Sequence, residues 1–531
     1  MLKEGGVQDM HSSRRSSNGG FFHGQAKSGK GKQERTLQFT ATIDIFEQKL
    51  RIKLDDSHRQ GGNLQGREIV HEFELRDILS AQQDSQDTKI MHLWTFKRYK
   101  QRKGCCSKEI KYKRKLEDFQ LIGESEKKTR EWCIIIQCAL DGLNNQSDFP
   151  KKRKILVLVN PFSGRRLAAA NWEIARPILE KSHIDMTVVM TQRAGHAYDV
   201  VNQEIKLGDY DGIVTVSGDG LIHEVVNGLY RRQDWLQLMS SLTLGFIPGG
   251  SANGLVKAVL DAAGEEYNVL NAAFLVAKGR HSKMDLTEIE AEYQKDKIYS
   301  FLSTFWGILA DCDINSEALR CLGTSRFTIW GVYRIMCRRR YTGSLYFTGQ
   351  SLKSKQELAS LNEDSFSPDL PEMMEDAVRH DENPDDYCFK NTQFSHVLIQ
   401  NTPFIGSSLH TGPLATINDG YNDIITQRFN AGRCSLAKML IDEDSGKYFE
   451  RNGQIRRDLR IQYTKCKAWR LDPLIKSPPP EKPSIVSTQE AQMSPKTRQD
   501  SEGSQKNAGL LALQEESKES QRLNPKCFLF Y

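Results

Sequence analysis

Apolar runs and amphipathic stretches alternate regularly between residues 151 and 287. Four apolar runs lie at residues 155–159, 186–190, 212–216 and 242–247, and runs of this kind are typical of strands buried in a parallel sheet. A stretch with helical periodicity follows each run, at residues 167–181, 198–206, 221–230 and from 255 onward. The repeated order of strand, loop and helix predicts an α/β fold with a doubly wound domain over residues 151–287. The loops that follow the carboxyl ends of its strands are expected to line a ligand crevice.

Shorter alternating patterns occupy the chain before this domain. Apolar residues alternate with polar ones at Leu37, Phe39, Ala41 and Ile43, and again at Leu50, Ile52 and Leu54, which predicts short strands joined by a turn. Further alternation near residues 68–75 and 90–96 precedes a helical stretch at residues 126–143 that carries Trp132. Several strands closed by one helix resemble a PH-like (pleckstrin-homology-like) domain, expected over residues 36–145. Residues 1–35 are rich in Gly, Ser, Lys and Gln and are expected to be disordered.

The pattern changes again after Asp285, where short alternating strands dominate. We expect a second, mainly β domain of the sandwich type over residues 288–475. An acidic, Pro-containing insert at residues 353–386 is expected to be a disordered loop within it. The tail at residues 476–531 is rich in Ser, Pro, Gln and Lys, and disorder is expected there too.

Charge and cysteine content narrow the class of protein. The net charge is +6, but Lys and Arg cluster at residues 97–103, 111–115 and 338–340, which fits either a solvated surface or contact with an anionic membrane. No nucleic-acid-binding motif accompanies these clusters, so no nucleic acid is expected as a partner. The 11 cysteines include no CxxC pair, which argues against a disulfide framework and favours a reducing compartment.

Membrane association is expected to be peripheral. The start of the chain has no apolar signal-peptide segment, and no apolar run reaches the ~18–20 residues that span a bilayer. The expected location is therefore cytoplasmic, at the periphery of membranes.

Three Gly-containing loops follow predicted strands of the α/β domain. They are Asn160-Pro161-Phe162-Ser163-Gly164-Arg165, Ser217-Gly218-Asp219-Gly220 and Pro248-Gly249-Gly250-Ser251-Ala252-Asn253-Gly254. Gly lets backbone N–H groups approach an anion, and the following helix adds its positive end. None has the GK[ST] ending of a Walker A loop. Three such loops at one sheet edge predict a phosphate-binding site.

Asp219 is the one acid in the second of these loops. A carboxylate beside a phosphate is electrostatically unfavourable unless a Mg²⁺ ion or a reacting hydroxyl requires it. The alternative is that Asp219 caps the helix that follows. The presence of two other phosphate-compatible loops favours a role for Asp219 with a Mg²⁺ ion or a reacting hydroxyl.

At this point the chain resembles a known family. Residues 217–229, SGDGLIHEVVNGL, are similar to the sphingosine kinases of the diacylglycerol-kinase-catalytic superfamily. Residues 305–313, FWGILADCD, look like the segment of those enzymes that receives the lipid head group, and further similarities extend the resemblance over roughly residues 154–473. The amino-terminal region resembles the PH-like extension of ceramide kinases.

The resemblance implies an ATP- and Mg²⁺-dependent lipid kinase that phosphorylates the primary hydroxyl of a sphingoid base, with a β domain that binds the lipid. Asp219 would orient or deprotonate that hydroxyl. Residues implied at the nucleotide are Asn160, Arg165, Thr191, Ser217, Gly218, Gly220, Glu224, Ser251, Arg320 and Arg326. Asp313 would pair with the lipid ammonium, and Asp311 would have a structural or secondary role. Ile308, Leu309, Cys312 and Phe327 would line the alkyl-chain pocket, although such residues are equally typical of a domain core.

One departure from the family pattern keeps alternatives open. The family has an Asp-Gly-Glu turn shortly after the segment that matches residues 470–473, and none follows Pro473 here. Thr488-Gln489-Glu490 is the nearest candidate for a remnant. The alternatives are a ceramide kinase or other lipid kinase, and a catalytically weakened pseudokinase that binds nucleotide or lipid.

Overall fold

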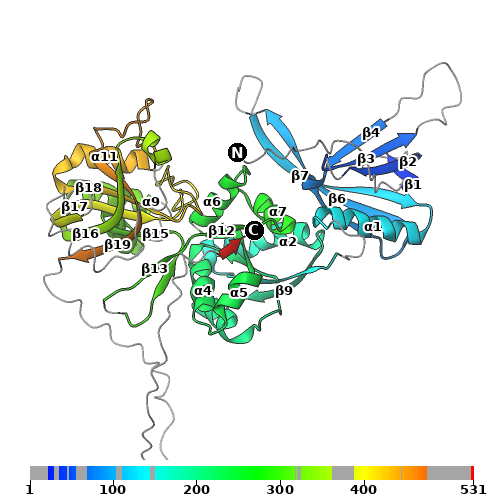
Figure 1. Ribbon diagram of the computed structural model, residues 1–531, viewed down its shortest axis with the longest axis horizontal. Coiled ribbons are helices and arrows are strands. Elements are labelled where there is room, and N and C mark those ends of the chain that lie inside the picture. Colours follow the sequence, from blue (N-terminus) through cyan, green and yellow to red (C-terminus); the bar gives the residue numbers. More distant parts are fainter. Residues whose placement is uncertain are drawn as a thin grey trace, which may run out of the picture.

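The computed structural model contains three units in chain order (Figure 1). It describes residues 22–28, 35–44, 47–55, 69–102, 110–143, 150–250, 252–292, 294–316, 318–319, 325–360, 388–443, 445–474 and 528–530. An N-terminal sheet and a β domain lie on opposite sides of a central α/β domain. No helix in these ranges is both long and apolar enough to cross a membrane.

The N-terminal unit is a seven-stranded antiparallel sheet with one helix. Its elements are β1 (Phe22–Ser28), β2 (Arg35–Asp44), β3 (Lys49–Asp55), β4 (Ile69–Glu74), β5 (Ile78–Gln83), β6 (Ile90–Arg102), β7 (Ile110–Gly123) and α1 (Glu126–Leu140). The strand order is β4-β3-β2-β1-β7-β6-β5. Helix α1 buries Trp132 and Ile136 in a core with Leu50, Ile52 and Met91. The PH-like interpretation of this unit stays a prediction.

The expected disorder of residues 1–35 is wrong for one segment. Residues 22–28 form β1, which pairs with β2 and with β7. The segment has no apolar alternation of its own that would predict a strand. Its strand conformation depends on backbone pairing with two neighbouring strands, which is a long-range effect.

The central unit is a mixed α/β domain with a largely parallel sheet. Its elements are β8 (Arg153–Val159), α2 (Leu167–Glu180), β9 (Ile184–Met190), α3 (His196–Asp199), β10 (Gly212–Ser217), α4 (Asp219–Tyr230), α5 (Trp235–Ser241), β11 (Thr243–Pro248), α6 (Gly254–Ala262), α7 (Val269–Lys278) and β12 (Ser282–Met284). The order is β12-β20-β11-β10-β8-β9, with β11, β10, β8 and β9 mutually parallel. Because parallel strands end at the same edge, the three Gly-containing loops meet there.

The inserted strand β20 (Phe528–Phe530) comes from the chain's last residues, which were expected to be disordered. It pairs with β11 in parallel and with β12 antiparallel, so three residues of that tail are part of the central sheet. The candidate remnant at residues 488–490 lies outside the described residues.

The third unit is a β domain that includes three helices among its described residues. It comprises β13 (Thr287–Ile289), β14 (Ile298–Ser300), β15 (Ser303–Gly307), α8 (Ile308–Asn315), α9 (Ser325–Met336), β16 (Tyr341–Leu352), β17 (Cys388–Gln400), β18 (Asn422–Arg428), α11 (Gly432–Glu443) and β19 (Ile461–Pro473). The main sheet has the order β15-β17-β16-β19-β18, and β17 also pairs with β18.

The five main strands form one sheet that closes on itself, because the first part of β17 pairs with β16 and its second part with β15 and β18. Strands β13 and β14 form a separate two-stranded sheet, and the sandwich interpretation of the domain stays a prediction. One expectation for this domain needs correction. Residues 353–360 are ordered although they belong to the predicted insert, since Ser354 bridges to Gln454 and a 3-10 turn follows at Lys355–Ser360. The rest of the insert lies outside the described residues.

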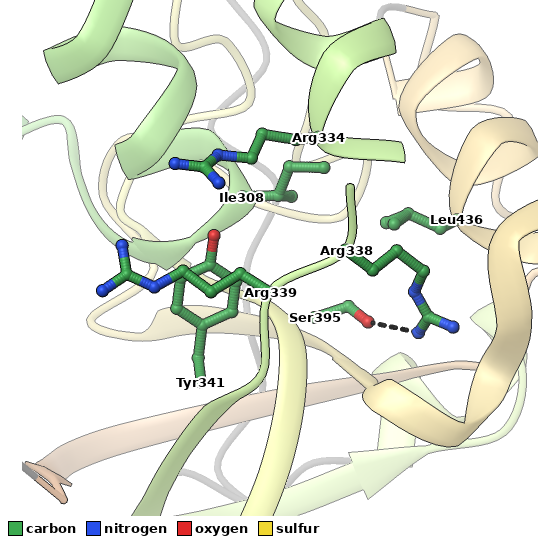
Figure 2. A pocket seen from close by; sticks show the side chains of 7 residues that line it. All are labelled: Ile308, Arg334, Arg338, Arg339, Tyr341, Ser395 and Leu436. Atoms are coloured by element: carbon green, nitrogen blue, oxygen red, sulfur yellow. Dashed lines mark hydrogen bonds between the residues drawn. The ribbon is translucent and has the colours of Figure 1, made fainter. Parts of the chain in front are cut away.

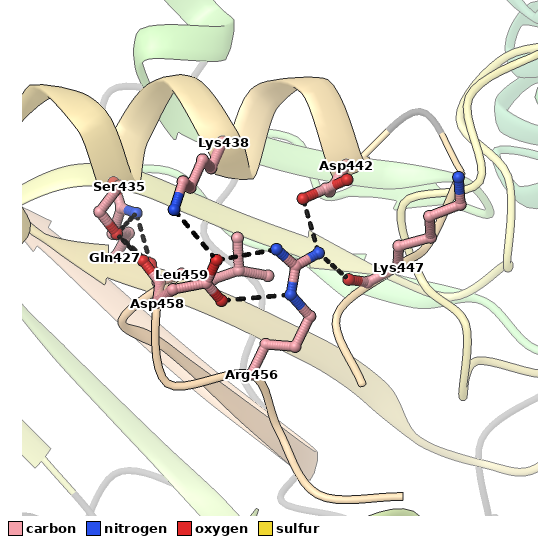
Figure 3. A network of polar contacts seen from close by, with 8 residues as sticks. All are labelled: Gln427, Ser435, Lys438, Asp442, Lys447, Arg456, Asp458 and Leu459. Carbon is pink, nitrogen blue, oxygen red and sulfur yellow. Dashed lines mark hydrogen bonds and ion pairs between the residues drawn. The ribbon is translucent and has the colours of Figure 1, made fainter. Parts of the chain in front are cut away.

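A polar network fixes α11 against the loop that leads into β19 (Figure 3). Arg456 donates to Asp442 on α11 at 2.7 Å and forks onto both carboxylate oxygens of Asp458 at 3.1 and 2.8 Å. Gln427 donates to the carbonyl of Leu459 at 2.7 Å in the buried part of the same network. A guanidinium that donates to both oxygens of a carboxylate fixes the relative orientation of the two groups.

Candidate active site

The three Gly-containing loops are in direct contact at the carboxyl edge of the central sheet. Gly164 has a left-handed backbone (φ +55°), and a side chain there would clash with the carbonyl of Gly249. A Cβ on Gly250 would lie 2.8 Å from the amide nitrogen of Gly218. Ser163 accepts a hydrogen bond from the Gly218 N–H at 3.2 Å. Gly is therefore required because the loops touch backbone to backbone.

Asn253 links these loops and is fully buried. Its side-chain amide donates to the Ser217 carbonyl at 2.7 Å, and its side-chain oxygen accepts from the Gly250 N–H at 3.1 Å. Its backbone is left-handed (φ +109°), a region in which Asn is tolerated better than most residues. The sequence prediction missed Asn253. Its only signal was an Asn just before a helix in a Gly-rich loop.

Asp219 begins α4 and points at the start of α6. Its carboxylate accepts from the backbone N–H groups of Asn253 at 3.0 Å, Gly254 at 2.9 Å and Leu255 at 3.3 Å. Burial raises the pKa of the Asp219 carboxyl above its ordinary value, and the N–H donors of Gly254 and Leu255 offset part of that rise. Asp219 thus caps α6 across the loop junction, while it also lies among the phosphate-compatible loops.

The β domain closes the site from the other side. A side chain on Gly254 would lie 2.7 Å from both the carbonyl oxygen of Phe404 and the carbonyl carbon of Ile405. Lys257 lies over the ring of Phe404 with its nitrogen 4.6 Å from the centroid. Asp219 therefore lies near a junction of the central and β domains, where a nucleotide and a second substrate can meet.

Some of the other residues predicted to bind the nucleotide lie at strand ends of the central sheet, and others lie outside the described residues. Asn160 and Thr191 follow the ends of β8 and β9, and Thr191 is buried and donates its backbone N–H to the Val159 carbonyl at 2.8 Å. Ser217 is buried at the end of β10, and Gly220 lies open in the first turn of α4. Ser251, Arg320 and the Arg165 side chain lie outside the described residues.

Glu224 carries an unmet hydrogen-bond acceptor. It lies one turn beyond Gly220 on α4, and its Oε2 atom is buried without a hydrogen-bond partner among the residues that the structure describes. A buried carboxylate oxygen of this kind is unfavourable unless a ligand satisfies it. The described residues contain no group of three or more His, Cys, Asp or Glu that could hold a metal ion by themselves.

Two acids on α8 have different surroundings. Asp311 forms an ion pair with Arg334 at 3.0 Å and accepts from the Tyr341 hydroxyl at 2.6 Å, with Arg339 at 3.7 Å. Figure 2 shows Arg334 and Arg339 on the same side of a small cavity as the Tyr341 hydroxyl, whereas Arg338 extends toward Ser395. Burial, reinforced by the Asp311 hydrogen bond, raises the pKa of Tyr341. Asp313, two residues on, is exposed.

The predicted alkyl-chain residues differ in burial. Ile308 and Cys312 are buried in the core of the β domain, and Leu309 packs against it. Phe327 is 39% exposed on α9, where Arg326 stacks over its ring at 4.5 Å. Of the four, only Ile308 lines the cavity of Figure 2, whose volume of about 10 Å³ suits a single water. Ile308 and Cys312 thus serve as core residues in this conformation.

Comparisons with known proteins identify a family and several similar proteins. Residues 154–289 match the family of diacylglycerol kinase catalytic domains. A putative diacylglycerol kinase from Bacillus anthracis str. Sterne superposes with a TM-score of 0.41 at 17% identity, over 62% of this chain and 88% of that chain.

Curated relatives give the closer similarity. Sphingosine kinase 1 of Arabidopsis thaliana is 30% identical over 340 residues, which cover 63% of this chain and 67% of that protein. Sphingosine kinase 1 of Mus musculus is 31% identical over 309 residues, which cover 57% of this chain and 79% of that protein. The chain therefore belongs to the sphingosine kinase family of the diacylglycerol kinase superfamily, and it is an ATP-dependent lipid kinase.

Proposed function

We propose that this kinase transfers the γ-phosphate of ATP to the primary hydroxyl of a sphingoid base. The observation that carries the proposal is the position of Asp219. Asp219 belongs to one of the three loops that touch backbone to backbone, and its carboxylate accepts from the start of α6, next to a junction with the β domain. Phosphate groups suit the loops, and a lipid hydroxyl suits the carboxylate.

In the proposed reaction, the lipid oxygen attacks the γ-phosphorus while the bond to the β–γ bridging oxygen breaks and ADP leaves. The hydroxyl proton passes to Asp219. A carboxylate is a weak base, but phosphoryl transfer depends mainly on positioning and charge stabilisation. The Gly-containing loops would hold the phosphates, with Asn160, Thr191, Ser217 and Gly220 among the residues beside them.

The residues present fit a Mg²⁺ ion that arrives with ATP. Mg²⁺ at kinase sites takes most of its ligands from phosphates and water, with one or two carboxylates. Asp219 and the unsatisfied Oε2 of Glu224 are the candidate carboxylates on α4. When bound, the ion would neutralise charge on the transferring phosphoryl group, and Arg326 would add to that effect.

We assign recognition of the lipid amine to Asp313. Asp311 already has Arg334 as an ion-pair partner and accepts a hydrogen bond from the Tyr341 hydroxyl. Asp313 is exposed on the same helix, where a lipid ammonium can approach it. A buried or half-buried ammonium requires a carboxylate partner.

The direct test is transfer of labelled γ-phosphate from Mg-ATP to sphingosine, ceramide and diacylglycerol. We expect product from sphingosine, and loss of product in Asp219→Asn. Asp313→Asn should reduce turnover of sphingosine much more than turnover of ceramide, which has no ammonium. Product from ceramide alone would favour the ceramide kinase alternative. ATP binding without any transfer would favour the pseudokinase alternative.

We also propose that the kinase binds anionic membranes peripherally through α9. This helix buries none of its described side chains and exposes Ile329, Val332, Tyr333 and Met336, each between 48% and 66%. Arg338, Arg339 and Arg340 follow it directly. Exposed apolar side chains next to arginines suit an anionic bilayer surface. Vesicles with phosphatidylserine should sediment the protein better than neutral ones, and Val332→Asp should abolish the difference. Equal sedimentation by both would refute this proposal.

A further inference from the structure

Arg114 is buried between the N-terminal sheet and the central domain. It belongs to a basic cluster that the sequence suggested lies on the surface, yet its side chain is only 5% exposed. Its Nε and Nη2 donate to the two carboxylate oxygens of Glu265 at 3.1 and 2.6 Å. Its Nη1 donates to Asp77 and to the Phe96 carbonyl, both at 2.8 Å. The guanidinium is therefore held on all three nitrogens.

The contacts of the Arg114 guanidinium depend on its planar shape and on its charge. The guanidinium also stacks on the ring of Phe274 at 4.1 Å. Burial by itself would lower the pKa of Arg114, but the hydrogen bonds that Arg114 donates to Glu265 and Asp77 outweigh it and raise the pKa. A planar fork that satisfies two carboxylates at once is a geometry that Lys cannot reproduce.

Glu265 is fixed to the far end of α6. The helix ends in a Schellman motif in which the Gly264 N–H bonds to the Asp261 carbonyl at 2.9 Å and the Glu265 N–H to the Leu260 carbonyl at 2.8 Å. Gly264 has the left-handed backbone that this motif requires (φ +66°). Arg98 adds a bond to the Gly264 carbonyl at 3.3 Å. The N-terminal sheet thus grips the end of α6 at two adjacent residues.

The other end of α6 holds Asp219. Gly254 and Leu255, the first two residues of the helix, donate their N–H groups to that carboxylate. A helix of nine residues is a short rigid rod of roughly 14 Å. Any tilt of its far end therefore moves the donors that orient Asp219.

We propose that Arg114 and Glu265 are positioning residues, which make the N-terminal sheet part of the catalytic apparatus by fixing α6 and hence Asp219. This inference rests on the proposed function of Asp219. It assigns the N-terminal sheet a role in the phosphoryl-transfer step itself, in addition to any role in localisation.

The same interface offers a matched control away from α6. Lys278, near the end of α7, donates to the carbonyls of Leu75 and Ile78 at 3.0 and 2.7 Å. Ser80 donates to the Lys181 carbonyl beyond α2 at 2.5 Å. These contacts join the same two units but do not touch α6. Lys278→Met should therefore weaken the interface between the two units while the contacts of Arg114 and Arg98 at the end of α6 remain.

The experiment compares Arg114→Met, Arg114→Lys, Glu265→Gln and Lys278→Met in the full chain, with kcat and KM for ATP and sphingosine. We expect the three variants at the Arg114–Glu265 pair to lose about tenfold in kcat, because a small misplacement of reacting groups has an effect of this size. Their KM values should stay within about twofold, since ground-state binding is retained. Lys278→Met should keep kcat even where it lowers the melting temperature.

Hydrogen exchange supplies a readout that does not depend on activity. The amides of residues 253–256 should exchange faster in Arg114→Met than in the wild type, and should remain unchanged in Lys278→Met. If the wild type lacked kinase activity and these amides still exchanged faster in Arg114→Met, the effect of Arg114 on the start of α6 would be supported and the proposed function would be refuted. Equal kcat losses in Arg114→Met and Lys278→Met, or unchanged exchange in Arg114→Met, would overturn the positioning role.

Discussion

The backbone N–H of Asn253 donates to the Oδ2 atom of Asp219 across 3.0 Å, while the Asn253 side chain bonds to Ser217 and Gly250. One buried residue thus connects the β10–α4 loop, the β11–α6 loop and the proposed catalytic carboxylate. Preorganised polar groups of this kind fix geometry before the substrate arrives.

Asn253→Ala should destabilise the protein by about 2–4 kcal/mol, because it leaves the Gly250 N–H without its side-chain partner, removes one of the hydrogen bonds that the Ser217 carbonyl accepts, and places Ala at positive φ. Chemical denaturation measures this loss in the free energy of unfolding. Asn253→Gly is the control, since it removes the same hydrogen bonds but relieves the backbone strain, and it should lose less. Equal losses would show that the φ value contributes nothing.

The pH dependence of activity should report the buried state of Asp219. Its pKa is raised above the ordinary value, mainly by burial, so the ionised form that accepts a proton is lost as pH falls through this raised pKa. The acid limb of kcat should therefore lie above the range of an ordinary Asp, about 3.9. Measurement of kcat between pH 4 and 9 tests this, and an acid limb at or below that range would contradict it.

The contribution of Asp219 to the free energy of unfolding should fall as pH rises through its raised pKa, whereas activity should rise. The folded protein binds this proton more tightly than the unfolded chain, so the contribution of Asp219 to stability is present below the unfolded pKa and is lost as pH rises through the folded one. Asp219→Asn should flatten this part of the profile. A wild-type and mutant difference that is constant with pH would show that Asp219 is not the group responsible.

Gly250→Ala should separate the phosphate loops. The new Cβ would meet the backbone of Gly218, with its amide nitrogen at 2.8 Å, and backbone cannot move aside as a flexible side chain does. We expect weaker ATP binding, measured by calorimetry, and a loss of about 1–3 kcal/mol in stability. Gly220→Ala is the steric control for stability, because nothing lies within 4 Å of a Cβ there. A stable Gly250→Ala protein with wild-type ATP affinity would contradict the contact.

The central sheet could be predicted because its strands carry their own signal. The apolar runs at residues 155–159 and 212–216 are buried on both faces as β8 and β10, and the Gly-rich turns mark where they end. The loops and Asp219 could therefore be located from local pattern alone.

Long-range pairing explains what the sequence did not reveal. Arg114 lies in a run of basic residues, and its burial depends on Glu265, 151 positions away. Asp311 and Asp313 are two residues apart on one helix, and only the tertiary positions of Arg334 and Tyr341 distinguish them. Residues whose role depends on distant partners have no local periodicity to detect.

A buried charge cluster in the β domain offers a further test. Lys465 is 1% exposed and bonds to Asp419 at 2.6 Å and to Asp423 at 2.8 Å, and the Tyr463 hydroxyl also donates to Asp423. Burial raises the pKa of Asp423 to about 6, although Lys465 opposes that rise. The cluster has two carboxylates for one ammonium, so its balance depends on pH.

Lys465→Met should destabilise the protein more at pH 8 than at pH 5. Above the raised pKa of Asp423 that carboxylate is ionised and lacks its cation, and removal of one partner from a buried pair costs about 3–5 kcal/mol. At pH 5 Asp423 takes up a proton in place of the lost ammonium, so the loss is smaller. Urea unfolding at the two pH values measures the difference. Lys467→Met, the same substitution at a half-buried position on the same strand, should show little dependence on pH. If both variants lost the same stability at both pH values, the contacts of the Lys465 side chain stem, and not its charge, would be what stabilises the domain.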